Sequence, residues 1–231
     1  MSAIAHAVII AAVFLLAQAP ELLTRSMTVE TEFAERVFNG GYRELTIRRI
    51  NAMRADGSFM RQEHFTGKDG LFAEALHTRF DEMWFPIRAV RWQVNYQTRE
   101  ITESTYQPGS SVSPRWPPLA GLRPLPQGLG PEGACAVDAV RNLRNVRRVG
   151  SGMAAGFAIE RFRGKPRNDI ELDEVEMGFA PAFGCWYLEW IGWRIGFLRW
   201  SVYSDRVTSI RFGEPDPALF QAPANYTRKR Y

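Results

Sequence analysis

Residues 43–65 read RELTIRRINAMRADGSFMRQEHF, and this stretch has the pattern of a β-hairpin. In its first half, Leu45 and Ile47 lie two positions apart and therefore share one face of a strand, with Arg49 on the same face. The sequence Ala-Asp-Gly-Ser at 55–58 then contains an Asp-Gly pair, which is typical of a tight hairpin turn. We therefore expect two antiparallel strands joined by this turn.

Further segments of the chain have a similar strand pattern and are mostly separated by turn residues. They span 90–96, 100–106, 156–163, 170–179, 185–191, 193–203 and 206–212. Residues 28–39 fit a helix as well as a strand, whereas 70–84 favour a helix because apolar residues recur there with a period of 3.6. A short helix is also expected at 137–143. Roughly nine strands in two runs, with one or two helices, indicate the α+β class: an antiparallel sheet with helices on one side.

A proline-rich segment separates the two runs of strands. Residues 107–133 contain seven of the fourteen prolines and are interpreted as a long loop. This loop could be a domain boundary, or it could lie over a single sheet. We expect the second arrangement, in which residues 20–231 form one α+β domain.

The charge of the chain does not point to a nucleic-acid partner. Lys and Arg number 29 against 25 Asp and Glu, which gives a net charge of +4. Arg and Glu are interleaved along the expected strands, and only the sequence TRKR at 227–230 forms a basic cluster. Interleaved charges are typical of a solvated strand face, so no nucleic-acid surface is predicted.

The N-terminus has features of an export signal. Residues 4–16 form an apolar run, and the small-x-small sequence Ala-Gln-Ala follows it. Residues 1–19 are therefore interpreted as a signal peptide, and the protein as periplasmic or secreted. No Lys or Arg precedes the run, and Pro20 follows the expected cleavage site, so the alternative is a membrane anchor at residues 4–19. A transmembrane helix needs about 20 apolar residues, which is more than this run provides.

The chain has two cysteines, Cys135 and Cys185. In an exported protein, a single pair of cysteines favours a disulfide bond. The alternative is two buried thiols in a cytoplasmic protein. A tetrahedral metal site is not expected because no histidine lies near either cysteine in the sequence.

Residues 211–226 read RFGEPDPALFQAPANY and contain three prolines, with the large apolar residues Leu219 and Phe220 among them. Asp216 can cap a helical turn, and Pro217 suits its first position. The turn would then place Leu219 and Phe220 under the last strand, where they can be buried. We call residues 211–226 the C-terminal clasp and expect it to have a structural role.

The clasp resembles the C-terminal signature of a bacterial family of uncharacterised exported proteins, which end in Gly-Glu-Pro-Asp-Pro, Leu-Phe, Pro and Tyr. The sequence FAPAFGCW at 179–186 is similar to an Ala-Pro-x-x-Gly-Cys element of the same proteins, and the turn at 55–58 resembles their early hairpin. The resemblance covers residues 43–226. It implies a fold similar to the periplasmic lipoprotein carriers (LolA-like): an open half-barrel in which a curved antiparallel sheet wraps around helices and holds apolar ligands on its concave side. It supplies no catalytic residues.

Motifs of known catalytic or metal-binding chemistry are scarce. The three histidines are His6, His64 and His77, and the last two are interpreted as surface residues although either could act as a general base. The chain contains no HExxH, GxSxG, P-loop or CxxC sequence. We therefore predict no catalytic residue, no metal site and no cofactor.

Aromatic residues are concentrated near the C-terminus, with seven of them between residues 186 and 203. Trp186 and Trp190 share a strand face by period two, and Trp92 and Tyr96 are expected on a strand opposite them. One interpretation is a sheet core. The other is an apolar ligand pocket on the concave side, for which these four residues are the candidates.

The sequence predicts an exported protein that binds an apolar or lipid-like ligand or acts as an envelope scaffold. Contact with a membrane through the N-terminal segment is also consistent with the sequence. The alternatives are an enzyme that uses the same pocket and a protein-binding module in envelope signalling. A histidine inside the pocket would favour the enzyme, and a filled interior would exclude the carrier.

Overall fold

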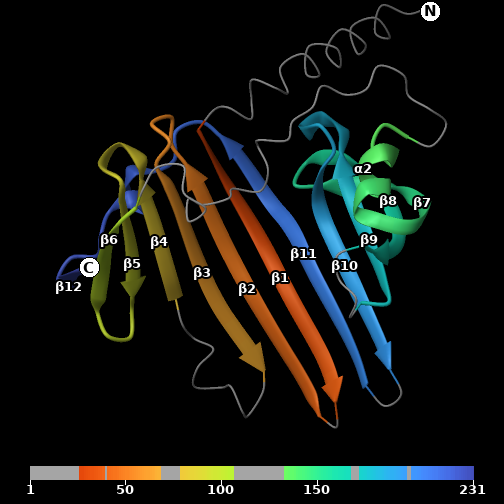
Figure 1. Ribbon diagram of the computed structural model, residues 1–231, viewed down its shortest axis with the longest axis horizontal. Helices are drawn as coiled ribbons and strands as arrows, with labels where there is room; N and C mark the ends of the chain where they lie inside the picture. The colour runs from red at the N-terminus through yellow and green to blue at the C-terminus, as the bar shows by residue number, and fades with distance from the viewer. Residues whose placement is uncertain (1–25, 40, 69–78, 107–132, 168–171, 197–198) are drawn as a thin grey trace, which may run out of the picture.

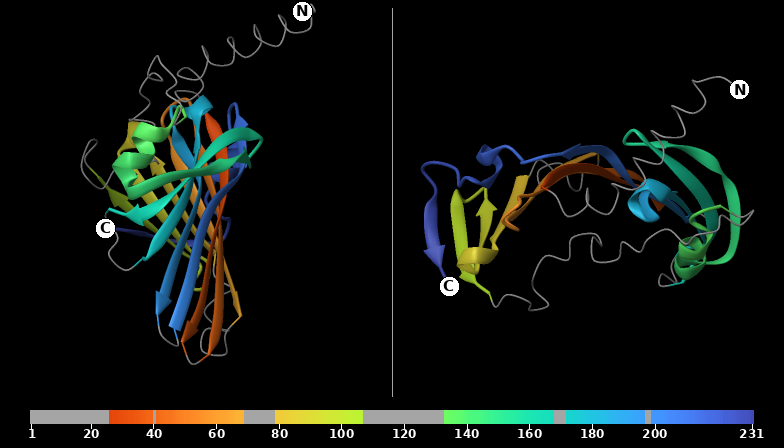
Figure 2. Two further views of the ribbon diagram at one scale, coloured as in Figure 1. Left: turned by 90° about the vertical axis from the view of Figure 1, so that its right-hand side faces the viewer. Right: turned by 90° about the horizontal axis from the view of Figure 1, so that it is seen from above.

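The computed structural model describes residues 26–39, 41–68, 79–106, 133–167, 172–196 and 199–231. Within these ranges the strands form one twelve-stranded sheet, in the order β12-β6-β5-β4-β3-β2-β1-β11-β10-β9-β8-β7. The sheet curves into an open arch (Figure 1, Figure 2). The expected curved, unclosed sheet is therefore confirmed, whereas the expected number of about nine strands is wrong.

The strands are β1 (Met27–Asn39), β2 (Tyr42–Met53), β3 (Phe59–Lys68), β4 (Arg79–Phe85), β5 (Val90–Asn95), β6 (Glu100–Thr105), β7 (Leu143–Ala154), β8 (Phe157–Pro166), β9 (Glu174–Ala180), β10 (Trp186–Gly196), β11 (Arg199–Phe212) and β12 (Thr227–Arg230). The α-helix of the described ranges is α2 (Ala136–Asn142), and short 3₁₀ turns are η1 (Pro86–Arg88), η3 (Pro181–Phe183) and η4 (Pro217–Phe220). The predictions for residues 1–19, His77 and nearly all of the proline-rich loop lie outside the described residues.

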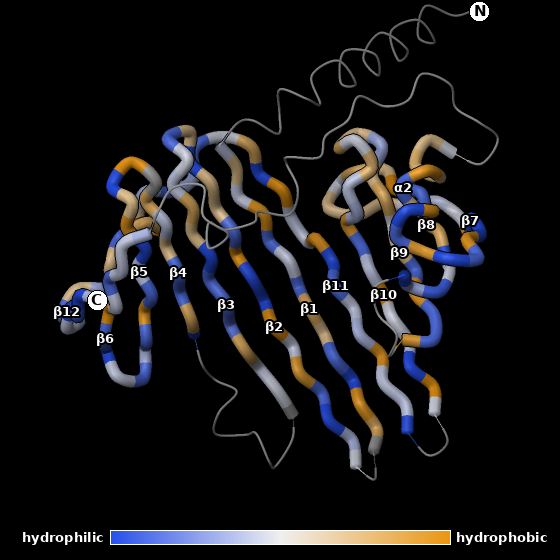
Figure 3. Tube along the Cα trace, in the orientation of Figure 1, coloured by the Kyte–Doolittle hydropathy of each residue, from blue (hydrophilic) through white to orange (hydrophobic). Residues whose placement is uncertain are grey.

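The two longest strands, β1 and β11, join the two runs of strands at the centre of the sheet. β1 pairs antiparallel with β2 on one side and with β11 on the other. The sequence of β1 was ambiguous because Val29, Phe33 and Val37 are four positions apart, a spacing that suits one helix face and is also a multiple of two. Pairing on both sides resolves the ambiguity in favour of a strand. Hydrophobic and hydrophilic residues are interspersed along these central strands (Figure 3).

Buried side chains form three hydrophobic clusters. The disulfide cluster comprises Cys135, Ala139, Leu143, Phe162, Leu172, Val175, Met177, Phe179 and Cys185. The clasp cluster comprises Ala52, Met60, Met83, Val94, Ile101 and Phe220. The central cluster comprises Met27, Val29, Ala154, Ile159, Ala180, Phe183, Leu188 and Val207. The core is thus distributed along the arch, because a curved open sheet has no single enclosed interior.

Helix α2 and turn η4 cover opposite faces of the sheet. Figure 2, seen from above, shows α2 within the arch and η4 on its outer side. Helix α2 packs in the disulfide cluster, and η4 places Phe220 in the clasp cluster. Among the described elements, α2 therefore lies on the concave face and η4 on the convex face (Figure 2).

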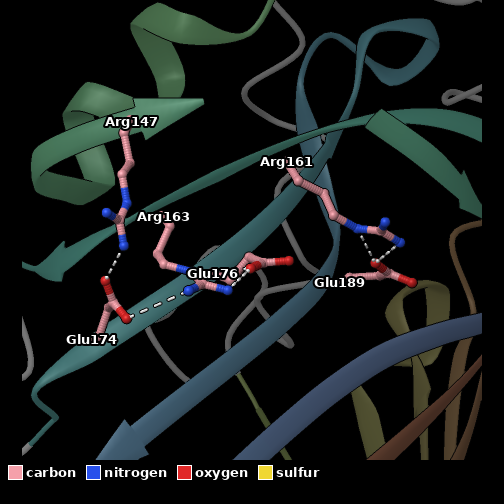
Figure 4. A network of polar contacts seen from close by, with 6 residues as sticks. All are labelled: Arg147, Arg161, Arg163, Glu174, Glu176 and Glu189. Carbon is pink, nitrogen blue, oxygen red and sulfur yellow. Dashed lines mark hydrogen bonds and ion pairs between the residues drawn. The ribbon is translucent and has the colours of Figure 1, made fainter. Parts of the chain in front are cut away.

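Charged residues on β7 to β10 form a network of ion pairs (Figure 4). Arg163 donates to Glu176 at 2.6 Å, and Arg161 donates to Glu189 at 2.9 Å. Arg147 pairs with Glu174 at 3.1 Å. Within this network each arginine has a carboxylate partner. Glu189 is buried, so the network lies only in part on the solvated strand face that the sequence predicted.

Residues 79–84, predicted as the end of a helix, belong to β4, so this part of the prediction is wrong. Asp81, Glu82, Met83 and Trp84 are all buried, although alternate residues of a strand point to opposite faces. A strand that is covered on both faces loses the apolar-polar alternation by which strands are recognised. In residues 79–84 the apolar side chains happen to match the helical period of 3.6, which led to the wrong prediction.

The strand boundaries near the C-terminus also differ from the prediction. Residues 193–203 and 206–212 were expected to be separate strands, but β10 continues to Gly196 and β11 runs unbroken from Arg199. Gly192, which lies between two of the segments predicted as separate strands, is inside β10. A side chain at this position would be too close to its neighbours, because a Cβ atom would lie 2.9 Å from Leu172 Cδ1. This glycine is therefore explained by close packing against Leu172, and it does not end the strand. Strands β7 and β12 were missed altogether.

Candidate functional site

The concave face carries two adjoining cavities, of about 320 and 300 Å³, which share Tyr187 and Asp205. We call them together the trough. The polar half is lined by Thr31, Arg49, Asn51, Arg61, Glu63, Trp186, Tyr187, Leu188, Asp205 and Val207. The apolar half is lined by Phe33, Asn142, Leu143, Pro166, Leu172, Val175, Met177, Tyr187, Trp190 and Asp205.

Strand register explains why the polar half gathers residues so distant in sequence. Val207 of β11 pairs with Thr31 of β1, Thr31 pairs with Arg49 of β2, and Arg49 pairs with Glu63 of β3. Directly paired residues of antiparallel strands share a face, so these four side chains form one row across the sheet. Arg49 donates to Glu63 at 2.9 Å and lies 3.8 Å from Asp205.

The apolar half is formed by a second row of paired residues, which runs from β9 to β1. Met177 of β9 pairs with Trp190 of β10, Trp190 pairs with Asp205 of β11, and Asp205 pairs with Phe33 of β1. Asp205 therefore stands where the two halves meet. Helix α2 bounds this half, because Leu143, which directly follows the helix, packs in the disulfide cluster.

A β-bulge brings β10 into the trough. The register between β9 and β10 shifts between Tyr187 and Glu189, which leaves Leu188 as an extra residue. Bulges re-aim neighbouring side chains, and here the consecutive residues Trp186, Tyr187 and Leu188 all line the polar half.

Three buried polar atoms of the polar half have no hydrogen-bond partner. They are Arg61 Nε, Trp186 Nε1 and Asp205 Oδ1. Buried polar atoms without partners are uncommon, because each forfeits a hydrogen bond to water. Trp84 Nε1 is the other such atom among the described residues. Three of the four such atoms thus belong to residues that line one cavity.

Asp205 lies half-buried where the two halves of the trough meet. Burial raises the pKa of the Asp205 carboxyl, although Arg49 acts in the opposite direction. Burial and the Asp205 charge both raise the pKa of the Tyr187 hydroxyl. A carboxyl group with a raised pKa in a cavity is a frequent feature of functional sites.

We expect Asp205→Asn to stabilise the protein near neutral pH by about 0.5–1 kcal/mol, because it removes a partly buried carboxylate with an unpaired oxygen. The folded protein holds the Asp205 proton more tightly than the unfolded chain does. The free energy of unfolding therefore falls as pH rises above the ordinary carboxyl pKa of 3.8 toward the raised value. Urea unfolding of both proteins should show a difference that disappears below pH 3.8. A variant less stable than the parent at neutral pH would contradict this account.

The four aromatic candidates from the sequence are not brought together. Trp186 lines the polar half of the trough, and Trp190 lines the apolar half. Trp92 and Tyr96 instead pack against the clasp cluster, and five strands separate β5, which carries Trp92, from β10. Their ligand-binding role stays a prediction.

Trp92 and Tyr96 have partners of their own at the clasp cluster. Trp92 Nε1 donates to Glu103 at 3.0 Å, and the Tyr96 hydroxyl donates to Asp81 at 2.5 Å. Burial and this hydrogen bond raise the pKa of Tyr96. Each polar atom thus has a local partner and needs no ligand.

The predicted disulfide is confirmed. Cys135 and Cys185 are bonded, with their Cα atoms 5.3 Å apart. The bond fixes the start of α2 against the turn between η3 and β10. Glu160 strengthens this attachment, since it accepts hydrogen bonds from the backbone N–H groups of Ala134 and Cys135 at 3.1 and 2.9 Å.

Sequence reasoning missed the charged residues of the trough, although one signal was available. Arg49 interrupts the apolar face of β2, and Asp205 lies inside a long aromatic-rich strand. A charged residue on an otherwise apolar strand face is a candidate for a buried site. His64, in contrast, is exposed and lies in register with Arg48, outside the trough.

The described part of the chain contains no group of three or more His, Cys, Asp or Glu residues arranged to hold a metal ion. It also contains no helix with the length and apolar character needed to cross a membrane.

No protein-family model and no curated protein matches this sequence. Solved structures with a similar fold include the MucA/MucB complex of Pseudomonas aeruginosa, at 16% identity and a TM-score of 0.41, covering 93% of this chain and 61% of that one. A putative outer membrane lipoprotein-sorting protein domain from Vibrio parahaemolyticus is 10% identical, with a TM-score of 0.31 and coverage of 88% and 94%. A LolA superfamily protein from Nitrosomonas europaea is 9% identical, with a TM-score of 0.28 and coverage of 90% and 96%. The chain spans about three fifths of the MucB chain, and its likeness to the LolA-like proteins is loose.

Proposed function

We propose that this protein is an exported binding protein of the cell envelope, which holds an amphiphilic, lipid-like ligand in the trough. The observation that carries the proposal is the composition of the trough. An apolar half and a polar half adjoin at Tyr187 and Asp205, and the polar half contains buried polar atoms without partners.

The two halves suit the two ends of one amphiphile. Cavities that bind small molecules measure about 300–1,000 Å³ and are mostly apolar with a few placed polar groups. Each half is near the lower limit of this range, at about 320 and 300 Å³. An acyl chain beside Trp190 and Met177 would leave water, at about 0.8 kcal/mol for each buried methylene group.

The alternative functions use the same trough. An enzyme would need a group that can accept or donate a proton, and Asp205 is the candidate because its pKa is raised. His64 does not line the trough; it lines a separate cavity of about 800 Å³ together with Glu32 and Arg48. A segment of a partner protein is the other possible occupant, and the test below distinguishes it from a lipid.

Native mass spectrometry of the protein purified from its own envelope tests the proposal. A co-purified mass that is extractable into organic solvent and resistant to protease would support a lipid ligand. A protease-sensitive mass would indicate a peptide instead. Protein without any bound mass that also fails to bind a fluorescent fatty acid would overturn the proposal.

Tyr187→Ala is expected to weaken binding of a fluorescent fatty acid by about tenfold. Tyr187 lines both halves of the trough but is 38% exposed, so its removal should affect the ligand more than the fold. Loss of one aromatic contact corresponds to about 1.5 kcal/mol, hence about a factor of ten in the dissociation constant. The dissociation constant can be measured by energy transfer from Trp186 and Trp190 of the trough to the fluorescent fatty acid.

The matched control is Tyr42→Ala, because Tyr42 is 52% exposed and is not a trough residue. This variant should bind the probe as the parent does. Equal affinities for both variants would place the ligand elsewhere on the protein.

A further inference from the structure

The charges of the polar half point to the chemistry of the ligand's head group. Two arginines and two carboxylates line it: Arg49, Arg61, Glu63 and Asp205. Arg49 contacts both carboxylates, at 2.9 Å to Glu63 and 3.8 Å to Asp205. Because the two pairs of opposite charges balance, the polar half does not select for a ligand with a large net charge of either sign.

Arg61 and Asp205 are the two members of this set with unmet bonding capacity. Arg61 Nε is buried without an acceptor, and Asp205 Oδ1 is buried without a donor. They line one cavity, yet within the described residues they form no ion pair with each other. A ligand that fits between them must offer an acceptor to Arg61 and a donor to Asp205.

Trp186 adds a second donor. Its Nε1 atom is also buried without a partner and lines the same half. Two donors with one arginine among them suit a group with several acceptor oxygens, such as a phosphate, because arginine and phosphate form strong charge-assisted hydrogen bonds. One carboxylate oxygen suits an ammonium group.

We propose that the polar half recognises a zwitterionic head group, in which a phosphate accepts hydrogen bonds from Arg61 and Trp186 while an ammonium group contacts Asp205. This inference rests on the proposed function and names the class of amphiphile, a phosphoethanolamine lipid. A head group with both a phosphate and an ammonium group would pair all three buried atoms. A head group that lacks the ammonium group leaves Asp205 unpaired and should therefore bind more weakly.

The test compares two lysolipids with the same acyl chain, lysophosphatidylethanolamine and lysophosphatidylglycerol, by calorimetry below their micelle concentrations. The parent protein should bind lysophosphatidylethanolamine at least tenfold more tightly.

Two variants test the residues that contact the head group. Arg61→Gln should weaken binding of lysophosphatidylethanolamine by about tenfold. Asp205→Asn should remove most of the preference between the two lipids, a result that a merely structural role would not produce. Arg48→Gln is the matched control, because Arg48 is exposed on the same strand as Arg49 and is not a trough residue.

The outcomes separate this inference from the function on which it rests. Equal affinity of the parent for both lysolipids would overturn the zwitterion inference and leave lipid binding intact. Absence of binding for both would overturn the proposed function as well. Glycerophosphoethanolamine, which has no acyl chain, should bind at least tenfold more weakly than the lysolipid. Equal affinity for it would assign the site to a soluble zwitterion instead of a lipid.

Discussion

Replacing Phe220 with alanine is expected to lower the free energy of unfolding by about 3–5 kcal/mol. Phe220 is 6% exposed and lies in the clasp cluster with Met60, Met83, Val94 and Ile101. Truncation of a buried aromatic ring loses its transfer free energy and leaves a cavity that rigid strands cannot fill. Arg54 also lies over the ring, with its guanidinium carbon 5.5 Å from the ring centre.

The turn that carries Phe220 has little stability of its own. Fixing the backbone of each residue costs about 1–2 kcal/mol, and the four residues of η4 provide few hydrogen bonds in return. Asp216 caps the turn by accepting a hydrogen bond from the Ala218 N–H at 2.9 Å. Burial of Phe220 in the clasp cluster is therefore the main packing contact that holds the turn against the sheet.

Glu214→Ala is the matched control in the same segment. Glu214 pairs with Arg54 at 2.7 Å, but its side chain is 44% exposed, so its loss should cost at most about 1 kcal/mol. Urea unfolding of the two variants gives the comparison. Small and equal shifts of the midpoint would show that the clasp does not stabilise the sheet.

The clasp shows what a local pattern can predict. The capping Asp216, Pro217 at the first position and burial of Phe220 follow from the order of residues alone, and all three are observed. The partners of Phe220 do not follow from it. They lie on β2 to β6, at sequence separations that no local pattern spans, and not under the last strand as expected.

The candidate site was predicted only in part, for the same reason. Trp186 and Trp190 lie on one strand, but the bulge at Leu188 falls between them and interrupts the period of two from which a shared face was predicted. Period two also cannot tell which strands lie beside β10. β5, which carries Trp92, is separated from β10 in the sheet by the five strands β4, β3, β2, β1 and β11. The rows that form the trough depend on this strand order and on the bulge at Leu188, and neither has a local signature.

Strand β7 was missed because it resembles a loop in composition. It is an edge strand that contains glycines and several arginines, and most of its residues are exposed. Charges at an edge strand oppose pairing with other chains. They also remove the apolar alternation by which the strand could have been found.

Removal of the disulfide, by substituting both Cys135 and Cys185 with alanine, is expected to lower the free energy of unfolding by about 4 kcal/mol. The two cysteines are 50 residues apart, so the bond greatly restricts the unfolded chain. In the folded protein both are buried in the disulfide cluster, beside the apolar half of the trough. Alanine at these positions loses the cross-link and also some packing.

Urea unfolding with and without a reducing agent separates the cross-link from the packing. Reduction should destabilise the parent by nearly as much as the double substitution does, and it should leave the double variant unchanged. The loss should also reach the trough, because α2 is attached to the sheet through Cys135 and through the Glu160 hydrogen bonds. Weaker binding of the fluorescent fatty acid after reduction, at a urea concentration where the sheet is still folded, would follow from a loosened α2. A parent protein whose unfolding free energy is insensitive to reduction would show that the bond adds nothing to the packing around it.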